Sequence, residues 1–305
     1  CWPWAWNPKT STTTSDKPRT TGNELLKIAV PNKGSLAESA SGMLREAGYR
    51  QRHDPKDLVL VDEANGVEFY YLRPRDIAVY VGERTLDLGF TGRDMLLDSG
   101  ASAQEVLALG FGGTRFRFAA PGGSSWTASD LEGKRIATSY PGLLGAWLSE
   151  RGINARLIKL DGAVESAVKL GVADAVADVV ETGSTLKRAG LEMFGEPILI
   201  SEAILIQPTG VDRPERLDRL TRRLAGVMTA RNYKMIDYNV AASNLERASA
   251  ITPGIDSPTV SHLAREGWLA VRAMIPAKDA PTIMDELWNV GAEGILVTDI
   301  AACRL

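Results

Sequence analysis

The segment Val-Ala-Asp-Val-Val-Glu-Thr-Gly-Ser-Thr-Leu, residues 176–186, joins a short apolar run to a turn of small, hydroxyl-bearing residues. Residues 176–180 have the length and the β-branched content of a buried strand, and a helical pattern begins at Leu186. At the start of such a helix the first N–H groups lack partners, and together with the helix dipole they favour an anion. The segment therefore predicts an α/β fold with a phosphate-binding turn.

The chemistry of this turn is specific enough to exclude one class of site. Gly183 permits a backbone geometry closed to other residues and a close approach by a ligand oxygen. Three neighbours supply hydroxyl donors: Thr182, Ser184 and Thr185. No Gly-x-x-x-x-Gly-Lys-Ser/Thr segment occurs, which excludes a Walker-type loop. Asp178 and Glu181 are unusual beside an anion and fit a ligand that also carries hydroxyls or a metal, such as a sugar phosphate. The same residues are also typical of a capped βα turn without any ligand.

Composition narrows the class of protein. The chain has 305 residues, enough for two or three domains, with 44% hydrophobic and 24% charged residues. The net charge of −3 argues against nucleic acid and anionic membranes as partners. Cys1 and Cys303 form neither a disulfide framework nor a metal-ligand spacing, which favours a reducing compartment, the cytoplasm. No apolar run reaches the ~18 residues needed to cross a bilayer.

The order of elements predicts two lobes and a third domain. Residues 1–24 are of low hydrophobicity and predict a disordered N-terminal extension; an upstream extension is favoured over a transit peptide. Two α/β lobes joined by two crossings are expected, a shape typical of periplasmic binding proteins. Lobe I is assigned residues 25–115 and 197–212, and lobe II residues 116–196. Residues 213–305 form the C-terminal domain, beginning with a basic helix.

A longer pattern around the opening segment resembles a known signature. It runs Glu165-x5-Gly171-x-Ala173-x2-Val176-x-Asp178-Val179-x2-Thr182-Gly183-x-Thr185-Leu186 and is similar to that of the ATP phosphoribosyltransferases, which start histidine biosynthesis. The resemblance extends from about residue 25 to the C-terminus. It implies transfer of a phosphoribosyl group from phosphoribosyl pyrophosphate to N1 of ATP, Mg²⁺ bound with the phosphates, histidine as feedback inhibitor, and a homo-oligomer: a hexamer, or a dimer in exchange with it.

Lys33 is the candidate in the first strand–turn–helix unit. Residues 25–30 predict a strand and residues 36–47 an amphipathic helix, with Ser35 and Glu38 in the spacing of a capping box. Lys33 then lies at the carboxyl end of a strand, where α/β sheets bind ligands. A solvated turn lysine is the alternative from the residues alone. The resemblance implies that Lys33 meets the pyrophosphate of the sugar donor.

Two further turns supply candidates for the nucleotide. Residues 86–90 predict a strand that leads into the turn Thr91-Gly92-Arg93-Asp94, and Tyr140 follows a strand ending near residue 138. Asp94 is also explained as a first-turn helix acid, and Tyr140 as a half-buried tyrosine. The resemblance implies an ATP site formed by Gly92, Arg93, Asp94 and Tyr140.

The C-terminal residues follow the order of a ferredoxin-like βαββαβ domain. Such domains bind amino acids as regulators or serve only for assembly. The resemblance implies a histidine site, and the polar residues assigned to it are Asp237, Asn239, Ser257 and Thr259.

The implied reaction agrees with the scarcity of histidine. Adenine N1 has a lone pair and no proton to remove, so positioning and charge stabilisation suffice without a histidine base. Lys33, Asp178 and Glu181 are the expected catalytic residues. Two other classes remain open: a solute-binding protein for a phosphorylated ligand, and a phosphoribosyltransferase of the other common type. The spacing of Asp178 and Glu181 argues against the latter, which carries adjacent acids.

Overall fold

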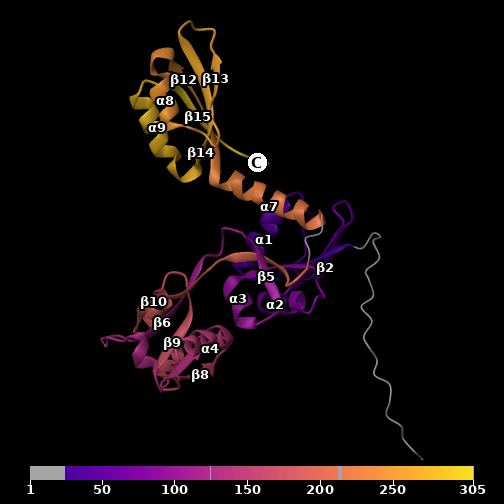
Figure 1. The fold of residues 1–305 in the computed structure, drawn as a ribbon, viewed down its shortest axis with the longest axis vertical. Helices are drawn as coiled ribbons and strands as arrows, with labels where there is room; N and C mark the ends of the chain where they lie inside the picture. The colour runs from indigo at the N-terminus through magenta and orange to yellow at the C-terminus, as the bar shows by residue number, and fades with distance from the viewer. Residues whose placement is uncertain (1–24, 124, 212–214, 305) are drawn as a thin grey trace, which may run out of the picture.

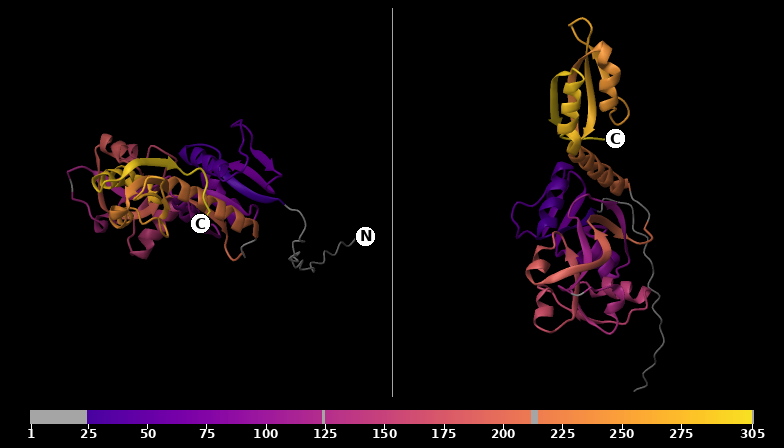
Figure 2. Two further views of the ribbon diagram at one scale, coloured as in Figure 1. Left: turned by 90° about the horizontal axis from the view of Figure 1, so that it is seen from above. Right: turned by 90° about the vertical axis from the view of Figure 1, so that its left-hand side faces the viewer.

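The computed structural model describes residues 25–123, 125–211 and 215–304. The expected disordered extension, residues 1–24, lies outside them. Within these ranges the strands form three sheets, one in each of two lobes and one in a C-terminal domain that stands clear of the lobes (Figures 1 and 2). None of the described helices is both long and apolar enough to cross a membrane.

The first sheet has the order β2-β3-β1-β4-β11-β5 and forms lobe I. At its centre β1 (Leu26–Pro31) lies parallel to both β3 (Val67–Leu72) and β4 (Leu88–Gly92). The remaining strands are β2 (Val59–Asp62), β5 (Ala103–Ala108) and β11 (Ala203–Pro208). Its helices are α1 (Ser35–Glu46), α2 (Pro74–Gly82) and α3 (Arg93–Ser99).

Both faces of this sheet are covered. Ile28 and Val30 pack into the core shared with α1, whereas Ala29 between them packs with Ile77 and Ala78 of α2 on the other face. A strand covered on both faces requires a continuous apolar run rather than an alternating one. This explains why β1 was recognisable in the sequence.

The second sheet has the order β10-β6-β9-β7-β8 and forms lobe II. Its strands are β6 (Thr114–Pro121), β7 (Arg135–Thr138), β8 (Arg156–Lys159), β9 (Ala175–Val180) and β10 (Leu191–Ser201). Its helical segments are η1 (Ala128–Leu131), α4 (Pro141–Glu150), α5 (Ser166–Lys169) and α6 (Ser184–Arg188). β7 and β9 run parallel, so the turns that follow them lie at the same edge of the sheet.

One lobe boundary differs from the expected one. Residues 197–201 were assigned to lobe I, but β10 continues to Ser201 and pairs with β6 in the second sheet, where Leu199 opposes Phe116. The chain returns to lobe I only at Ala203, in β11. The pairing of β10 with β6 has an irregular register between Phe194 and Leu199, the region in which the lobe boundary was expected.

The helix α7 (Glu215–Asn232) corrects a second boundary. It was assigned to the C-terminal domain, but its apolar side packs in the lobe I core through Leu217, Leu220, Leu224 and Val227. Arg231 near its end forms a two-point ion pair with Glu46 of α1, at 2.9 and 2.8 Å. The helix is therefore part of lobe I (Figure 1).

The C-terminal domain has the predicted βαββαβ order, and its sheet has the order β13-β14-β12-β15. The strands are β12 (Tyr233–Ala241), β13 (Thr259–His262), β14 (Trp268–Pro276) and β15 (Glu293–Asp299). The helices are α8 (Leu245–Ile251) and α9 (Ala280–Asn289), and short helical turns, η2 (Ala242–Asn244) and η3 (Ala277–Asp279), precede them. Buried side chains of β12, such as Ile236 and Val240, face these helices.

One local expectation is wrong. The predicted capping box at Ser35 is absent, because Gly34 is the N-cap of α1 with a φ of 81°, and no side chain caps it. Ser35 is instead the first helical residue.

Candidate active site

The predicted phosphate-binding turn connects β9 to α6. Gly183 is the N-cap of α6 and has a φ of 75°, in the left-handed region that favours glycine. The side chains of Thr182, Ser184 and Thr185 are exposed. Thr182 Oγ1 donates to Ser184 Oγ at 3.2 Å, so these hydroxyls bond with each other rather than with the rest of the protein. The turn thus leaves donors accessible to a ligand.

Asp178 is held at the carboxyl end of β9, three residues before Glu181. Its carboxylate accepts hydrogen bonds from Ser139 Oγ at 2.9 Å and from its neighbouring amide, Val179 N, at 2.8 Å. Burial raises the pKa of Asp178 above its ordinary value, against these hydrogen bonds and the charge of Arg75. Glu181 is exposed beside the hydroxyl-bearing turn. The two acids therefore differ: Asp178 is positioned, and Glu181 is open to solvent.

Lys33 lines a surface pocket of about 420 Å³ in lobe I. The pocket lies between the turn after β1, the start of α1 and residues 52–55, and it also contains Arg45, Arg52 and His53. Arg52 is fixed there, because its guanidinium donates to the Asn32 carbonyl at 2.8 Å and stacks 4.1 Å from the centre of the Tyr71 ring. Neither Arg45 nor Arg52 was predicted from the sequence, because nothing in the sequence places them beside Lys33.

In the turn at residues 91–94, Asp94 is buried, with 5% of its surface exposed. Its Oδ1 accepts from Ser201 Oγ at 2.9 Å, and the same hydroxyl accepts from the Asp94 amide at 3.0 Å. A side chain on Gly92 would place Cβ 2.3 Å from Asp94 Oδ1. Gly92 is thus required by the position of the Asp94 carboxylate.

The side chain of Arg93, in the same turn, makes its contacts with acidic residues of other segments. Its guanidinium binds both carboxylate oxygens of Glu105 at 2.9 Å and contacts Glu202 at 3.3 Å. Hydrogen bonding to Glu105 raises the pKa of Arg93 above its ordinary value. Because Glu202 joins β10 to β11, these contacts favour a structural role for Arg93 where the chain crosses between lobes, rather than the expected ATP contact.

Tyr140 begins the turn between β7 and α4 and is 4% exposed. Phe116 packs edge-on against its ring at 5.5 Å, and the Arg75 guanidinium lies over its face at 4.3 Å from the ring centre. Burial, followed by the charge of Asp94, raises the pKa of Tyr140. The structure thus brings Tyr140 and Asp94 together from different lobes, but a base could stack on this ring only if Arg75 moved.

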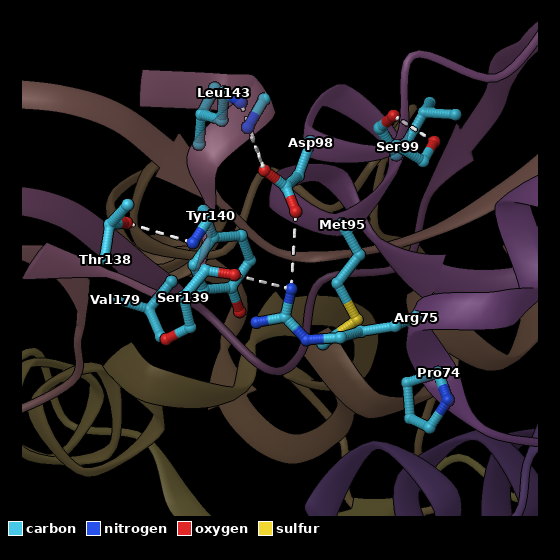
Figure 3. A network of polar contacts seen from close by, with 12 residues as sticks. Pro74, Arg75, Met95, Asp98, Ser99, Thr138, Ser139, Tyr140, Leu143 and Val179 are labelled. Atoms are coloured by element: carbon cyan, nitrogen blue, oxygen red, sulfur yellow. Dashed lines mark hydrogen bonds and ion pairs between the residues drawn. The ribbon is translucent and has the colours of Figure 1, made fainter. Parts of the chain in front are cut away.

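Two residues that connect the lobes were missed by sequence analysis. Arg75 of α2 donates to the Ser139 carbonyl at 2.8 Å, and Asp98 of α3 accepts from the amides of Gly142 and Leu143 at the start of α4 (Figure 3). The only signal in the sequence was the run Arg73-Pro74-Arg75-Asp76, which indicated a helix start and nothing more.

The predicted regulatory residues separate into two groups. Asp237, Asn239 and Thr259 line a pocket of about 340 Å³ on the sheet face away from α8 and α9, together with Arg272. Asp237 Oδ1 accepts from Arg272 Nε at 2.6 Å. Ser257 does not line this pocket; its hydroxyl contacts the Pro258 carbonyl at 3.3 Å.

Two α/β lobes, joined by two crossings of the chain and followed by a βαββαβ domain, define a two-lobed α/β protein with an added C-terminal domain. A protein-family model described as ATP phosphoribosyltransferase matches residues 73–226, and a second family model, described as HisG, C-terminal domain, matches residues 230–302. The chain belongs to the ATP phosphoribosyltransferase family. This confirms the predicted enzyme class, a glycosyltransferase that transfers a phosphoribosyl group, and its place at the first step of histidine biosynthesis.

Individual relatives agree with this assignment. The ATP phosphoribosyltransferase of Arthrobacter sp. (strain FB24) is 58% identical over 286 residues, covering 92% of the chain and 100% of the relative. That of Micrococcus luteus is 60% identical over 283 residues, with the same coverage. Among solved structures, the ATP phosphoribosyl transferase (HisG:HisZ) complex from Thermotoga maritima matches with 27% identity and a TM-score of 0.58, over 67% of this chain and 98% of that one.

Proposed function

We propose that the chain joins N1 of ATP to C1 of phosphoribosyl pyrophosphate, with release of pyrophosphate, and that the residues described above divide this work. The turn at residues 182–185 holds the 5′-phosphate, and Asp178 and Glu181 hold the ribose hydroxyls. The observation that carries the proposal is the position of Asp178. A partly buried carboxylate fixed by Ser139 lies on the strand that leads directly to accessible hydroxyls, which matches a ligand with a sugar ring and a phosphate.

Catalysis then depends on charge rather than proton transfer. The C1–pyrophosphate bond breaks as the N1–C1 bond forms, and negative charge collects on the leaving group. Lys33 receives this charge, supported by the neighbouring cations Arg45 and Arg52 in the same pocket. ATP occupies the place where Asp94 and Tyr140 face each other, with Gly92 beside them. Arg93 contributes by holding the crossing between the lobes.

Mg²⁺ is part of this proposal. Within the described ranges no group of three or more His, Cys, Asp or Glu side chains is placed to hold a metal ion. The carboxylates of Asp178 and Glu181 have the oxygen chemistry that Mg²⁺ prefers, and an ion that keeps several waters needs only one or two such ligands besides phosphate. When bound, the ion would neutralise charge on the pyrophosphate. The cytoplasm is the proposed location, since ATP is available there.

The reaction is tested by mixing the protein with ATP, phosphoribosyl pyrophosphate and Mg²⁺ and following pyrophosphate release. We expect release only when all three are present. Binding of phosphoribosyl pyrophosphate without release in the complete mixture would contradict the proposal and favour a solute-binding protein.

Histidine is proposed to bind the pocket lined by Asp237, Asn239 and Thr259. In that pocket the carboxylate and amide accept from the ligand's nitrogens, while Arg272 binds its carboxylate. In Asn239→Ala the histidine concentration for half-inhibition should rise about tenfold, the loss of roughly one hydrogen bond to a charged group. Ser257→Ala is the matched control, because Ser257 lies outside the pocket. An unchanged histidine concentration for half-inhibition in the Asn239→Ala variant would contradict this site.

Assembly into a homo-oligomer, a hexamer or a dimer in exchange with it, is supported by apolar side chains exposed on the C-terminal domain. Trp288 and Leu296 are 69% and 63% exposed, and Val260 is also accessible. Exposed apolar groups of this size are common at protein–protein contacts. Light scattering coupled to size-exclusion chromatography tests the proposal; a monomer at micromolar concentration would contradict it.

A further inference from the structure

A carboxylate of lobe I joins the two lobes at the start of α4, which belongs to lobe II. Asp98, near the end of α3 in lobe I, accepts from Gly142 N at 2.8 Å and from Leu143 N at 3.1 Å through one oxygen, Oδ1. These amides belong to the first turn of a ten-residue helix and have no partner within it. A carboxylate here also interacts favourably with the helix dipole. Asp98 thus caps a helix of lobe II from lobe I (Figure 3).

Arg75 extends this contact toward the proposed site. Its Nη1 lies 3.3 Å from Asp98 Oδ2 and donates to the Ser139 carbonyl at 2.8 Å. Ser139 in turn donates from its hydroxyl to Asp178, and the Arg75 guanidinium covers the Tyr140 ring. A continuous chain of contacts therefore runs from Asp98 of α3 through Arg75 to Ser139 (Figure 3) and from Ser139 to Asp178, the acid assigned to the ribose.

Gly142 allows the lobes to approach this closely. A Cβ at this position would lie 2.2 Å from the Asp98 carbonyl oxygen, a distance that no side chain tolerates. Because the obstacle is backbone of α3, the lobes themselves would have to move apart to accept a side chain here. The spacing between α3 and α4 is thus set by the absence of a side chain at Gly142.

We propose that Arg75 and Asp98 are positioning residues for phosphoribosyl transfer: they fix lobe II against lobe I so that Tyr140 faces Asp94 while Asp178 keeps its orientation. The inference rests on the proposed function, since it concerns the geometry of that reaction. It makes a specific distinction between the substrates. The turn at residues 182–185 lies wholly in lobe II, so it can bind a sugar phosphate without contacts between the lobes. The reaction, in contrast, requires that the two lobes hold a fixed position relative to each other.

Three variants of the full-length protein test the pair: Arg75→Gln, Asp98→Asn and Gly142→Ala. The first two remove the ion pair, and the third separates the lobes while leaving every charge in place. We expect kcat to fall between about 10- and 100-fold in each, the range for misplacement of reacting groups by about 1 Å. The dissociation constant of phosphoribosyl pyrophosphate, measured by calorimetry, should stay within about twofold of that of the unmodified protein.

A double variant tests whether Arg75 and Asp98 act through the same contact. In the Arg75→Gln/Asp98→Asn double variant we expect no greater loss than in the worse single variant, because both remove the same link. Arg156→Gln and Glu63→Gln, exposed residues of β8 and of the turn after β2, are the matched controls and should retain full turnover. Melting temperatures of the two ion-pair variants should change by less than about 4 °C, since the ion pair is partly exposed.

Several results would overturn the inference. These are normal kcat in Asp98→Asn and Gly142→Ala with loss only in Arg75→Gln, additive losses in the double variant, or tighter ATP binding once Arg75 is removed. The first would make Arg75 a direct substrate ligand, and the last a competitor for the Tyr140 ring. If the unmodified protein releases no pyrophosphate, the proposed function fails instead, and the two failures are thereby distinguished.

Discussion

Two turns at the same edge of the second sheet are built in opposite ways. The turn after β9, at residues 182–185, is exposed, leads into the five-residue helix α6, and makes side-chain hydrogen bonds mainly within itself. The turn after β7, at residues 138–142, is buried at Thr138 and Tyr140, leads into the ten-residue helix α4, and is bonded to lobe I by Arg75 and Asp98. The same strand–turn–helix unit thus leaves its hydroxyls accessible to solvent in one case and bonds its backbone to the other lobe in the second.

This difference separates effects on ligand binding from effects on the fold. Substitutions in the exposed turn should change substrate affinity and leave stability almost intact, because few contacts with the rest of the protein are lost. Substitutions that remove a hydrogen bond in the buried turn should lower stability instead, because the lost partner leaves a polar group unsatisfied.

The largest effect is expected at Gly183. In Gly183→Val a β-branched side chain meets a φ of 75° and a Cβ position 3.1 Å from Met193 Cε, so the turn must change shape. We expect affinity for phosphoribosyl pyrophosphate, measured by calorimetry, to fall about 100-fold. Gly190→Val is the control, because Gly190 has the same φ of 75° but open space around it and lies after α6. Equal losses of affinity in both variants would refute a specific role for the turn.

The next effect concerns Asp178 and its titration. Asp178→Asn should lower kcat about 30-fold, the equivalent of roughly 2 kcal/mol for a hydrogen bond to a charged group. Because burial raises the pKa of Asp178, the folded protein binds a proton here at higher pH than the unfolded chain does. The ionised form therefore costs stability above that pKa, and the cost is relieved as pH falls.

Activity should decrease as pH falls, whereas the contribution of Asp178 to stability becomes more favourable. As pH falls through the raised pKa, the anion that holds the ribose is lost, so kcat/KM should decline at a pH above the ordinary aspartate range. The Asp178→Asn variant should lack this acidic limb, and Asp256→Asn, an exposed control in the C-terminal domain, should retain it. An identical limb in the Asp178 variant would assign the titration to another group.

A smaller effect is expected at Lys33, which is exposed and shares its pocket with other cations. Lys33→Ala should lower kcat about tenfold through weaker stabilisation of the leaving pyrophosphate, the equivalent of about 1.4 kcal/mol. Lys278→Ala removes an exposed lysine of the C-terminal domain and is the control. Unchanged turnover in the Lys33 variant, measured as pyrophosphate release, would remove Lys33 from the mechanism.

A matched pair of threonines gives the smallest effects on turnover and the most direct comparison of the two turns. Thr138 is fully buried, and its Oγ1 accepts from the Tyr140 amide at 2.9 Å. Thr138→Val should lower the free energy of unfolding by about 1–3 kcal/mol, because that amide loses its partner. Thr185→Val should change it by less than about 0.5 kcal/mol while weakening phosphate binding a few-fold. Denaturant titration of both variants decides this, and equal stability losses would contradict the contrast between the turns.

Much of the fold was predictable because local patterns report burial. The apolar run of β1 is covered on both faces, the βαββαβ order of the C-terminal domain alternates strand and helix signals, and the strand and turn around Gly183 are continuous in sequence. The domain to which α7 belongs was not predictable in this way, although its position in the sequence was. An amphipathic helix indicates that one side is buried, but not against which domain.

The part of the site that escaped prediction depends on contacts between distant residues. Arg75 and Ser139 are separated by 64 positions, so neither local periodicity nor a motif places them together. Arg93 illustrates the reverse case. The family resemblance implied a contact of Arg93 with ATP, but Glu105 and Glu202 reach it from elsewhere in the chain and bind its guanidinium.

The helix α7 passes into β12 without an intervening loop, because Asn232 ends the helix and Tyr233 begins the strand. The 18-residue helix, about 27 Å long, is anchored in lobe I at Leu220 and Leu224 and by the ion pair of Arg231 with Glu46. The helix α7 therefore links the C-terminal domain to lobe I, and the chain end also packs on this helix, because the Cys303 carbonyl lies against Gly226. Any tilt of that domain must either turn α7, and lobe I with it, or bend the chain at residues 232–233 and shift Cys303 from α7.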